Sequence, residues 1–148
     1  MLNDTQNLLA FVYKNAQMGV QTLPGIAEKA TGEFRTAVEN RLAKYEKIKS
    51  EAERRLSRTG GVVSEKIGLN GFEKASVNMM LKMNLARDTS VGHMADMLIR
   101  GSAMGIRDIS EQIASYPGAD KSAVSLAQSL QKLEEDGLEE LKKYLSMV

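Results

Sequence analysis

The stretch TSVGHMADMLIRGSAMGIRDISEQIASY, residues 89–116, decides the fold that the sequence predicts. Its apolar positions recur every three or four residues, the spacing of one helix face, and they are Met94, Met97 or Leu98, Gly101, Met104 or Gly105, Ile109 and Ile113. Glycine inside a helix costs about 1 kcal/mol relative to alanine. We therefore expect a neighbouring helix to pack closely against Gly101 and Gly105. The alternative is a cleft in which a small ligand replaces a side chain.

The same helical spacing, bounded by capping residues and helix breakers, divides the rest of the chain. Asp4 or Thr5 is expected to cap a first helix, and Asn70 with Glu73 has the spacing of a capping box. Residues 60–69 begin with two glycines and predict a loop. The predicted helices are 4–30 with a bend near Pro24, 33–58, 71–87, 90–116 and 121–146.

Four of these helices are similar in length, and the remaining one lies in the connection between the second and third long helices. Equal lengths suit a bundle, because each apolar stripe is then covered from end to end. We therefore predict an all-α fold with a single domain over 1–148. It is a four-helix bundle with an additional helix in the crossover.

This order of helices resembles the ferritin-like four-helix bundles. The resemblance implies a di-iron site in which two helices each supply a carboxylate and the two others each supply Glu-x-x-His. The chain has a single histidine, His93, and the residue three before it is Ser90. The di-iron pattern is therefore absent, and we expect no metal and no other cofactor.

The second half of the chain carries a further resemblance. Residues 88–145, with the run M-L-I-R-G-S-x-M-G over 97–105, are similar to a bacterial family of small helical proteins without assigned function. That resemblance implies no activity.

Composition excludes several classes of function. The chain has no cysteine, which rules out disulfides, thiolate metal sites and cysteine nucleophiles. A net charge of +1 gives no general attraction to nucleic acid, and no apolar run is long enough to cross a bilayer. The start of the chain lacks the basic and apolar segments of a secretion signal, so we expect a cytoplasmic protein. The first 60 residues are basic on balance and residues 108–148 are acidic, which suits complementary protein surfaces.

His93 is the residue type most often used in catalysis, but its surroundings in sequence do not support a reaction. It lies three residues before Asp96 near a predicted helix start. A proton shuttle or single metal ligand is conceivable, and a hydrogen-bonded helical histidine is the favoured interpretation. No hydroxyl nucleophile is paired with it, so a catalytic triad has no support. We do not expect an enzyme.

The nine methionines are concentrated on apolar helix faces. Thioethers can bind copper(I), but methionine on such faces more often fills gaps in a core or an interface. Met79, Met80 and Met83 lie beside Lys74, Lys82 and Arg87 on one short helix. The default expectation is that these three methionines cover the bundle's own core. A surface for a partner protein or a membrane is the alternative.

The functional prediction is a non-enzymatic bundle that acts by protein contact, including self-association, with no nucleic-acid partner and with membrane-surface contact the least favoured. The alternative is a degenerate ferritin-like protein that binds a metal or small ligand in its core, using polar groups such as Tyr13 or Gln17. The candidate close-packing or ligand-cleft positions are His93, Met97, Gly101, Met104, Gly105 and Asp108. The candidate contact face is Met79, Met80 and Met83.

Overall fold

A computed structural model describes residues 2–60 and 67–147, and within these ranges the chain is all-helical. The predicted all-α class is confirmed. The helices are α1 (Asp4–Lys29), α2 (Gly32–Ser57), α4 (Gly71–Arg87), α5 (Val91–Ser115) and α6 (Lys121–Lys142). Most of the predicted 60–69 loop lies outside the described residues.

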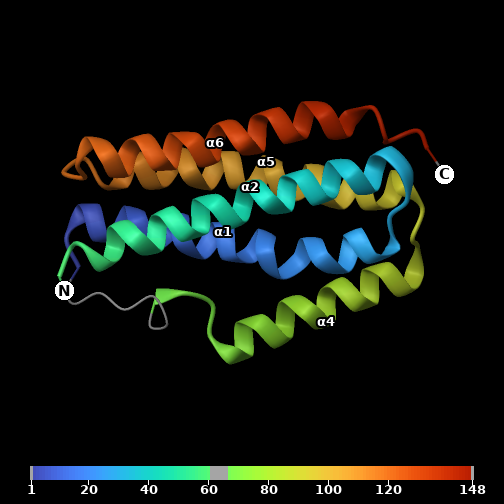
Figure 1. Cartoon of the computed structure of the whole chain (residues 1–148), viewed down its shortest axis with the longest axis horizontal. Helices are drawn as coiled ribbons and strands as arrows, with labels where there is room; N and C mark the ends of the chain where they lie inside the picture. The colour runs from blue at the N-terminus through green and yellow to red at the C-terminus, as the bar shows by residue number, and fades with distance from the viewer. Residues whose placement is uncertain (1, 61–66, 148) are drawn as a thin grey trace.

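The long helices form two hairpins that lie along each other (Figure 1). In one hairpin α1 packs on α2, and in the other α5 packs on α6. Helices α1 and α6 run in one direction and α2 and α5 in the other, and we call these four helices the hairpin core. Helix α4 lies outside the hairpin core, alongside α1.

Apolar stripes from all four long helices meet in the hairpin core, where Leu8, Val12, Ile109 and Leu130 are fully buried. Contacts at both ends join the hairpins. At one end the Phe34 and Tyr144 rings meet edge to face, with centroids 5.2 Å apart. At the same end the amide of Gly92 donates to the carbonyl of Met147 at 2.7 Å. A Cβ on Gly92 would lie 2.5 Å from that carbonyl oxygen, so only glycine fits there.

The predicted cap of α4 is confirmed, whereas that of α1 is wrong. Asn70 and Glu73 form a capping box on α4, and Ser90 caps α5. The cap of α1 is Asn3 rather than Asp4 or Thr5. The side chains of Asp4 and Thr5 instead accept hydrogen bonds from the amides of Gly118 and Asp120, in the connection between α5 and α6. Tertiary contacts therefore outweigh local capping here.

Two further boundaries test the sequence prediction. Helix α1 continues through Pro24 as one helix, and the bend expected there stays a prediction. Helix α6 ends at Lys142 rather than at 146. The next residues turn because the amides of Leu145 and Met147 bond to carbonyls three residues earlier. This turn carries the chain towards the start of α5.

The buried side of α5 is rotated from the predicted stripe. It consists of Met94, Ala95, Ser102, Gly105 and Ile109. Gly101 and Met104 are exposed, and Met97 is half-buried. The predicted stripe is confirmed at Met94, at Ile109 and at Gly105, which was the alternative to Met104, and it is wrong at Gly101. The helix turns the small residues Ser102 and Gly105 towards Arg41 of α2 and Glu134 of α6.

Candidate functional site

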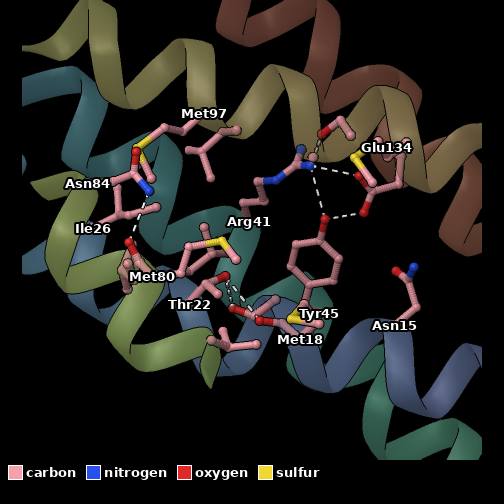
Figure 2. A pocket seen from close by; sticks show the side chains of 18 residues that line it. Asn15, Met18, Thr22, Ile26, Arg41, Tyr45, Met80, Asn84, Met97 and Glu134 are labelled. Carbon is pink, nitrogen blue, oxygen red and sulfur yellow. Dashed lines mark hydrogen bonds and ion pairs between the residues drawn. The ribbon is translucent and has the colours of Figure 1, made fainter. Parts of the chain in front are cut away.

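Four polar side chains from three helices meet inside the hairpin core. Arg41 and Tyr45 come from α2, Ser102 from α5 and Glu134 from α6, and each is at least nine-tenths buried. The Arg41 Nη2 atom lies 3.0 Å from Glu134 Oε2 and 3.0 Å from the Tyr45 hydroxyl. It also donates to Ser102 Oγ, and the Tyr45 hydroxyl donates to Glu134 Oε1 (Figure 2). We call these residues the polar cluster.

The polar cluster is electrically balanced. Burying a charge is costly unless the charge is paired and hydrogen-bonded, and Arg41 and Glu134 satisfy both conditions. Burial, together with the neighbouring Glu134 carboxylate, holds the pKa of the Tyr45 hydroxyl well above its usual range, although Arg41 acts in the opposite direction. Tyr45 therefore stays a neutral hydrogen-bond donor at all physiological pH values.

Glycines make the room that these large polar side chains occupy. A Cβ on Gly137 of α6 would lie 1.5 Å from Arg41 Nη1, and a Cβ on Gly19 of α1 would lie 2.6 Å from the Tyr45 ring. A Cβ on Gly105 would lie 3.4 Å from the Glu134 carboxylate. Arg41 Nη1 is buried and makes no hydrogen bond within the described part of the chain.

A cavity of about 410 Å³ opens beside the polar cluster, between α1, α4 and α5. Its floor includes Arg41, Tyr45, Ser102 and Glu134. Its other walls are predominantly apolar and include Met18, Leu23, Ile26, Val77, Met80, Leu81, Met97, Leu98 and Met104. Figure 2 shows Met80 and Met97 on one side of this space and the polar cluster on the other.

The structure separates the six predicted close-packing or cleft positions. Met97, Gly101 and Met104 line the cavity. No atom lies within 4 Å of a Cβ built on Gly101, so the predicted close packing at this residue is wrong. Gly105 does pack closely, against the Glu134 side chain rather than against a backbone.

His93 and Asp108 do not line the cavity. The amide of His93 bonds to Ser90 Oγ, and its Nε2 atom is buried without a hydrogen-bond partner among the described residues. The prediction of a hydrogen-bonded histidine is therefore not met at this nitrogen. Asp108 lies 3.6 Å from Arg107 on the same helix.

Tyr13 and Gln17, the other polar groups considered for a core site, hold the segment before α4. Gln17 Oε1 accepts a hydrogen bond from the amide of Leu69 at 2.6 Å. A Cβ on Gly68 would lie 2.8 Å from the Tyr13 ring. The predicted polar groups thus do not converge on one site. Across residues 2–60 and 67–147, no three histidine or carboxylate side chains are placed to hold a metal ion.

Helix α4 presents a large apolar surface to solvent. Phe72 is 80% exposed, and Met79, Met80 and Met83 are each about two-thirds exposed. The expectation that these methionines cover the core is wrong for Met79 and Met83, while Met80 lines the mouth of the cavity. The core side of α4 is instead formed by Val77, Leu81 and Leu85, at positions four residues apart.

Specific contacts fix α4 on α1. The Lys14 ammonium lies 3.0 Å from Glu73, and Gln21 donates to Asn78 at 2.7 Å. Leu81 lies over Gly25, where a Cβ would approach it to 2.8 Å. These contacts determine which face of α4 points outward.

The polar cluster was not predicted from the sequence, although the spacing of its residues was visible there. In α2 the buried positions 34, 38, 41, 45, 48 and 52 follow a strict three-four alternation, and position 41 is an arginine. In α6 the alternation 123, 127, 130, 134, 137 and 141 includes Glu134 and Gly137. A charge on each of two stripes, together with a glycine, was the available signal for a buried ion pair.

Comparison of the chain with protein-family models, curated proteins and solved structures finds no match. Among the described helices, none is long and apolar enough to cross a membrane. Any functional conclusion therefore depends on the cavity, the polar cluster and the surface of α4.

Proposed function

We propose that this chain is a ferritin-like four-helix bundle without a catalytic centre, and that it acts by protein contact. The contact we propose is with a second copy of the chain, through the outward face of α4. The observation that carries this proposal is that α4 is apolar on two opposite faces.

The course of the chain supports the ferritin-like part of the proposal. The second and third long helices, α2 and α5, run in the same direction. A connection between two parallel helices of a bundle has to return along the length of the bundle, and α4 lies in that connection. A connection of this kind supports the proposed ferritin-like crossover.

The outward face of α4 supports the contact. Phe72, Met79 and Ala86 are spaced seven residues apart, and Ala75, Ser76 and Met83 lie between them on the same side of the helix. All six residues are exposed, and none is charged. A helix that is apolar on both faces is normally covered on both. The hairpin core covers the face with Leu81, which leaves the face with Met79 for a partner.

The side chains on this face have complementary sizes when the faces of two copies meet. When two α4 helices pack antiparallel with Met79 opposite Met79, residues equally distant from Met79 face each other. Phe72 then faces Ala86 of the second copy, and Met83 faces Ala75. Each large side chain meets a small one, so the two helices can approach closely.

Sedimentation velocity over a wide concentration range tests this contact. We expect a wild-type dimer and a monomeric Met79→Lys variant, because the substitution places two like charges at the symmetry axis. Met79→Glu is also expected to be monomeric. An equimolar mixture of the two variants is expected to regain the dimer, because opposite charges then meet. Met104→Lys, on a comparably exposed methionine of α5, is the matched control and should leave the dimer intact.

Two outcomes would overturn the proposal. A wild-type protein that stays monomeric at every concentration excludes self-association through α4. A dimer that survives Met79→Lys places the contact elsewhere. If the monomeric wild type binds anionic liposomes, the outward face of α4 is a membrane-surface element instead.

A further inference from the structure

We infer that the cavity between α1, α4 and α5 is a binding site for a small neutral apolar molecule that carries a single hydrogen-bond acceptor, such as an aliphatic alcohol or ketone. The site is distinct from the outward face of α4, because neither Met79 nor Met83 lines it.

The size and walls of the cavity fit such a ligand. Its volume of about 410 Å³ lies within the usual range of small-molecule sites, about 300–1,000 Å³. Four methionines line it, Met18, Met80, Met97 and Met104. Methionine side chains are flexible and polarisable, so they adapt to apolar ligands of different shapes.

The polar floor determines the charge of the ligand. The Arg41 guanidinium is paired with the Glu134 carboxylate at 3.0 Å, so the floor carries no net charge. An anionic ligand would meet Glu134 and a cationic ligand would meet Arg41, and each would also have to lose its hydration. A neutral molecule avoids both costs.

Ser102 supplies the hydrogen bond that would orient the ligand. It is 1% exposed and lines the cavity. Its oxygen accepts from Arg41, and its hydroxyl proton has no acceptor among the described residues. Thr22 and Asn84, which also line the cavity, already donate to the carbonyls of Met18 and Met80. Ser102 is therefore a donor for an oxygen on the ligand, beside the side-chain amides of Asn15 and Asn84, which also line the cavity.

Gly101 keeps the cavity open. It lines the space, and a Cβ placed on it would have no atom within 4 Å. A Cβ at this position therefore meets open space, and a longer side chain is expected to extend into the cavity. This makes Gly101 a position at which the site can be filled while the fold is kept.

The test uses protein labelled with ¹³C on the methionine methyl groups and titrated with 1-decanol, followed by two-dimensional NMR. We expect saturable shifts of the methyl signals of Met18, Met80, Met97 and Met104. The methyl signals of Met79 and Met83, on the outward face of α4, serve as internal controls and should not move. Gly101→Leu should weaken binding at least about tenfold, whereas Ala103→Leu, an exposed position on the same helix, should leave it unchanged.

Charged probes of equal length test the ligand class. Decanoate and decylamine are expected to leave the four cavity methyl signals unmoved. The inference is overturned if decanol shifts no cavity signal, shifts the outward ones equally, or binds Gly101→Leu as tightly as wild type. Preferential binding of decanoate would replace the neutral class with an anionic one. The Met79→Lys variant should still bind decanol, so failure of the self-association proposal and failure of this one are distinguishable.

Discussion

At the residue scale, the buried side chains of the polar cluster require both a partner of opposite charge and space that neighbouring glycines provide. Arg41 and Glu134 are 93 residues apart in sequence and 3.0 Å apart in space. Gly137 accommodates Arg41 and Gly19 accommodates Tyr45, so a buried ion pair is accompanied by glycines that would otherwise weaken their helices. A pair of this kind contributes little when intact, but removal of one partner leaves an uncompensated buried charge.

Glu134→Gln is therefore expected to destabilise the protein by about 3–5 kcal/mol. The physical reason is that the Arg41 guanidinium stays buried without its counter-charge. The double variant Arg41→Met with Glu134→Leu should recover most of this loss, because no charge is then left buried without its partner. Urea denaturation followed by circular dichroism measures both. Equal stability of the single variant and wild type would contradict a buried pair.

Substitution of two different glycines by alanine is expected to change the stability of the protein in opposite directions. Gly101→Ala is expected to stabilise the protein by up to about 1 kcal/mol, because alanine favours the helix and the new methyl meets nothing. Gly137→Ala is expected to destabilise it by about 1–3 kcal/mol, because the methyl would occupy the place of Arg41 Nη1. Thermal unfolding of the two variants beside wild type decides this. A stabilising Gly137→Ala would show that Arg41 moves away freely.

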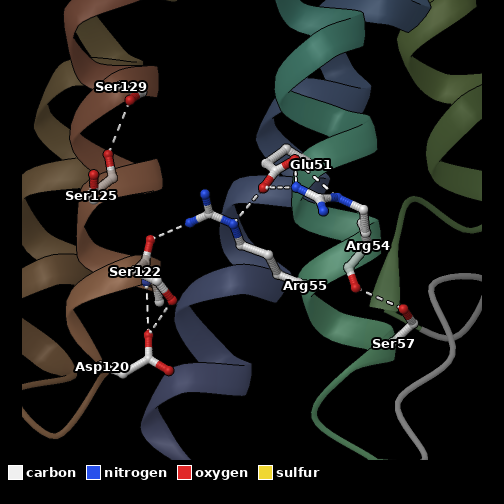
Figure 3. A network of polar contacts seen from close by, with 9 residues as sticks. Glu51, Arg54, Arg55, Ser57, Asp120, Ser122, Ser125 and Ser129 are labelled. Atoms are coloured by element: carbon white, nitrogen blue, oxygen red, sulfur yellow. Dashed lines mark hydrogen bonds and ion pairs between the residues drawn. The ribbon is translucent and has the colours of Figure 1, made fainter.

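At the scale of the elements, polar contacts fasten the end of α2 to the start of α6 (Figure 3). Glu51 pairs with Arg54 and with Arg55, the latter at 2.7 Å, and Arg55 donates to the carbonyl of Ser122. Asp120 caps α6 by accepting from the amide of Ala123 at 2.9 Å. One carboxylate thus positions the arginine that joins two helices from different hairpins.

The stability of the protein is expected to depend on pH through Glu51. Hydrogen bonds from Arg54 and Arg55 lower its pKa from 4.5 to about 2. Since the pKa is lower in the folded than in the unfolded chain, the contribution of Glu51 to stability is present above about pH 4.5 and is lost as the pH falls towards 2. Glu51→Gln should remove this part of the acid dependence. Carboxyl NMR titration measures the pKa directly, and a midpoint near 4.5 would contradict the pairing.

At the scale of the whole molecule, α4 determines both proposed activities because it has two faces. Its core side, with Val77 and Leu81, forms one wall of the cavity. Its outward side, with Phe72 and Met79, is free for a second copy of the chain. Self-association would cover α4 from outside and hold it over the cavity.

The sequence by itself determined the helices and most of their caps, because these depend on neighbours within a few residues. The capping box of Asn70 with Glu73 consists of local hydrogen bonds and was predicted correctly. The cap of α1 was not, because Asp4 and Thr5 bond to residues more than a hundred positions away.

Only the tertiary structure decided which way each helix is turned about its own axis. Periodicity marks an apolar stripe on α5 but does not say whether Ser102 or Gly101 faces the core, because both lie near it. The answer depends on Arg41 and Glu134, which come from two other helices and require a small polar neighbour. The same limit applied to α4, whose two apolar faces look alike in sequence. The contacts of Glu73, Asn78 and Leu81 with α1 select the inner face, and Met79 is left outside.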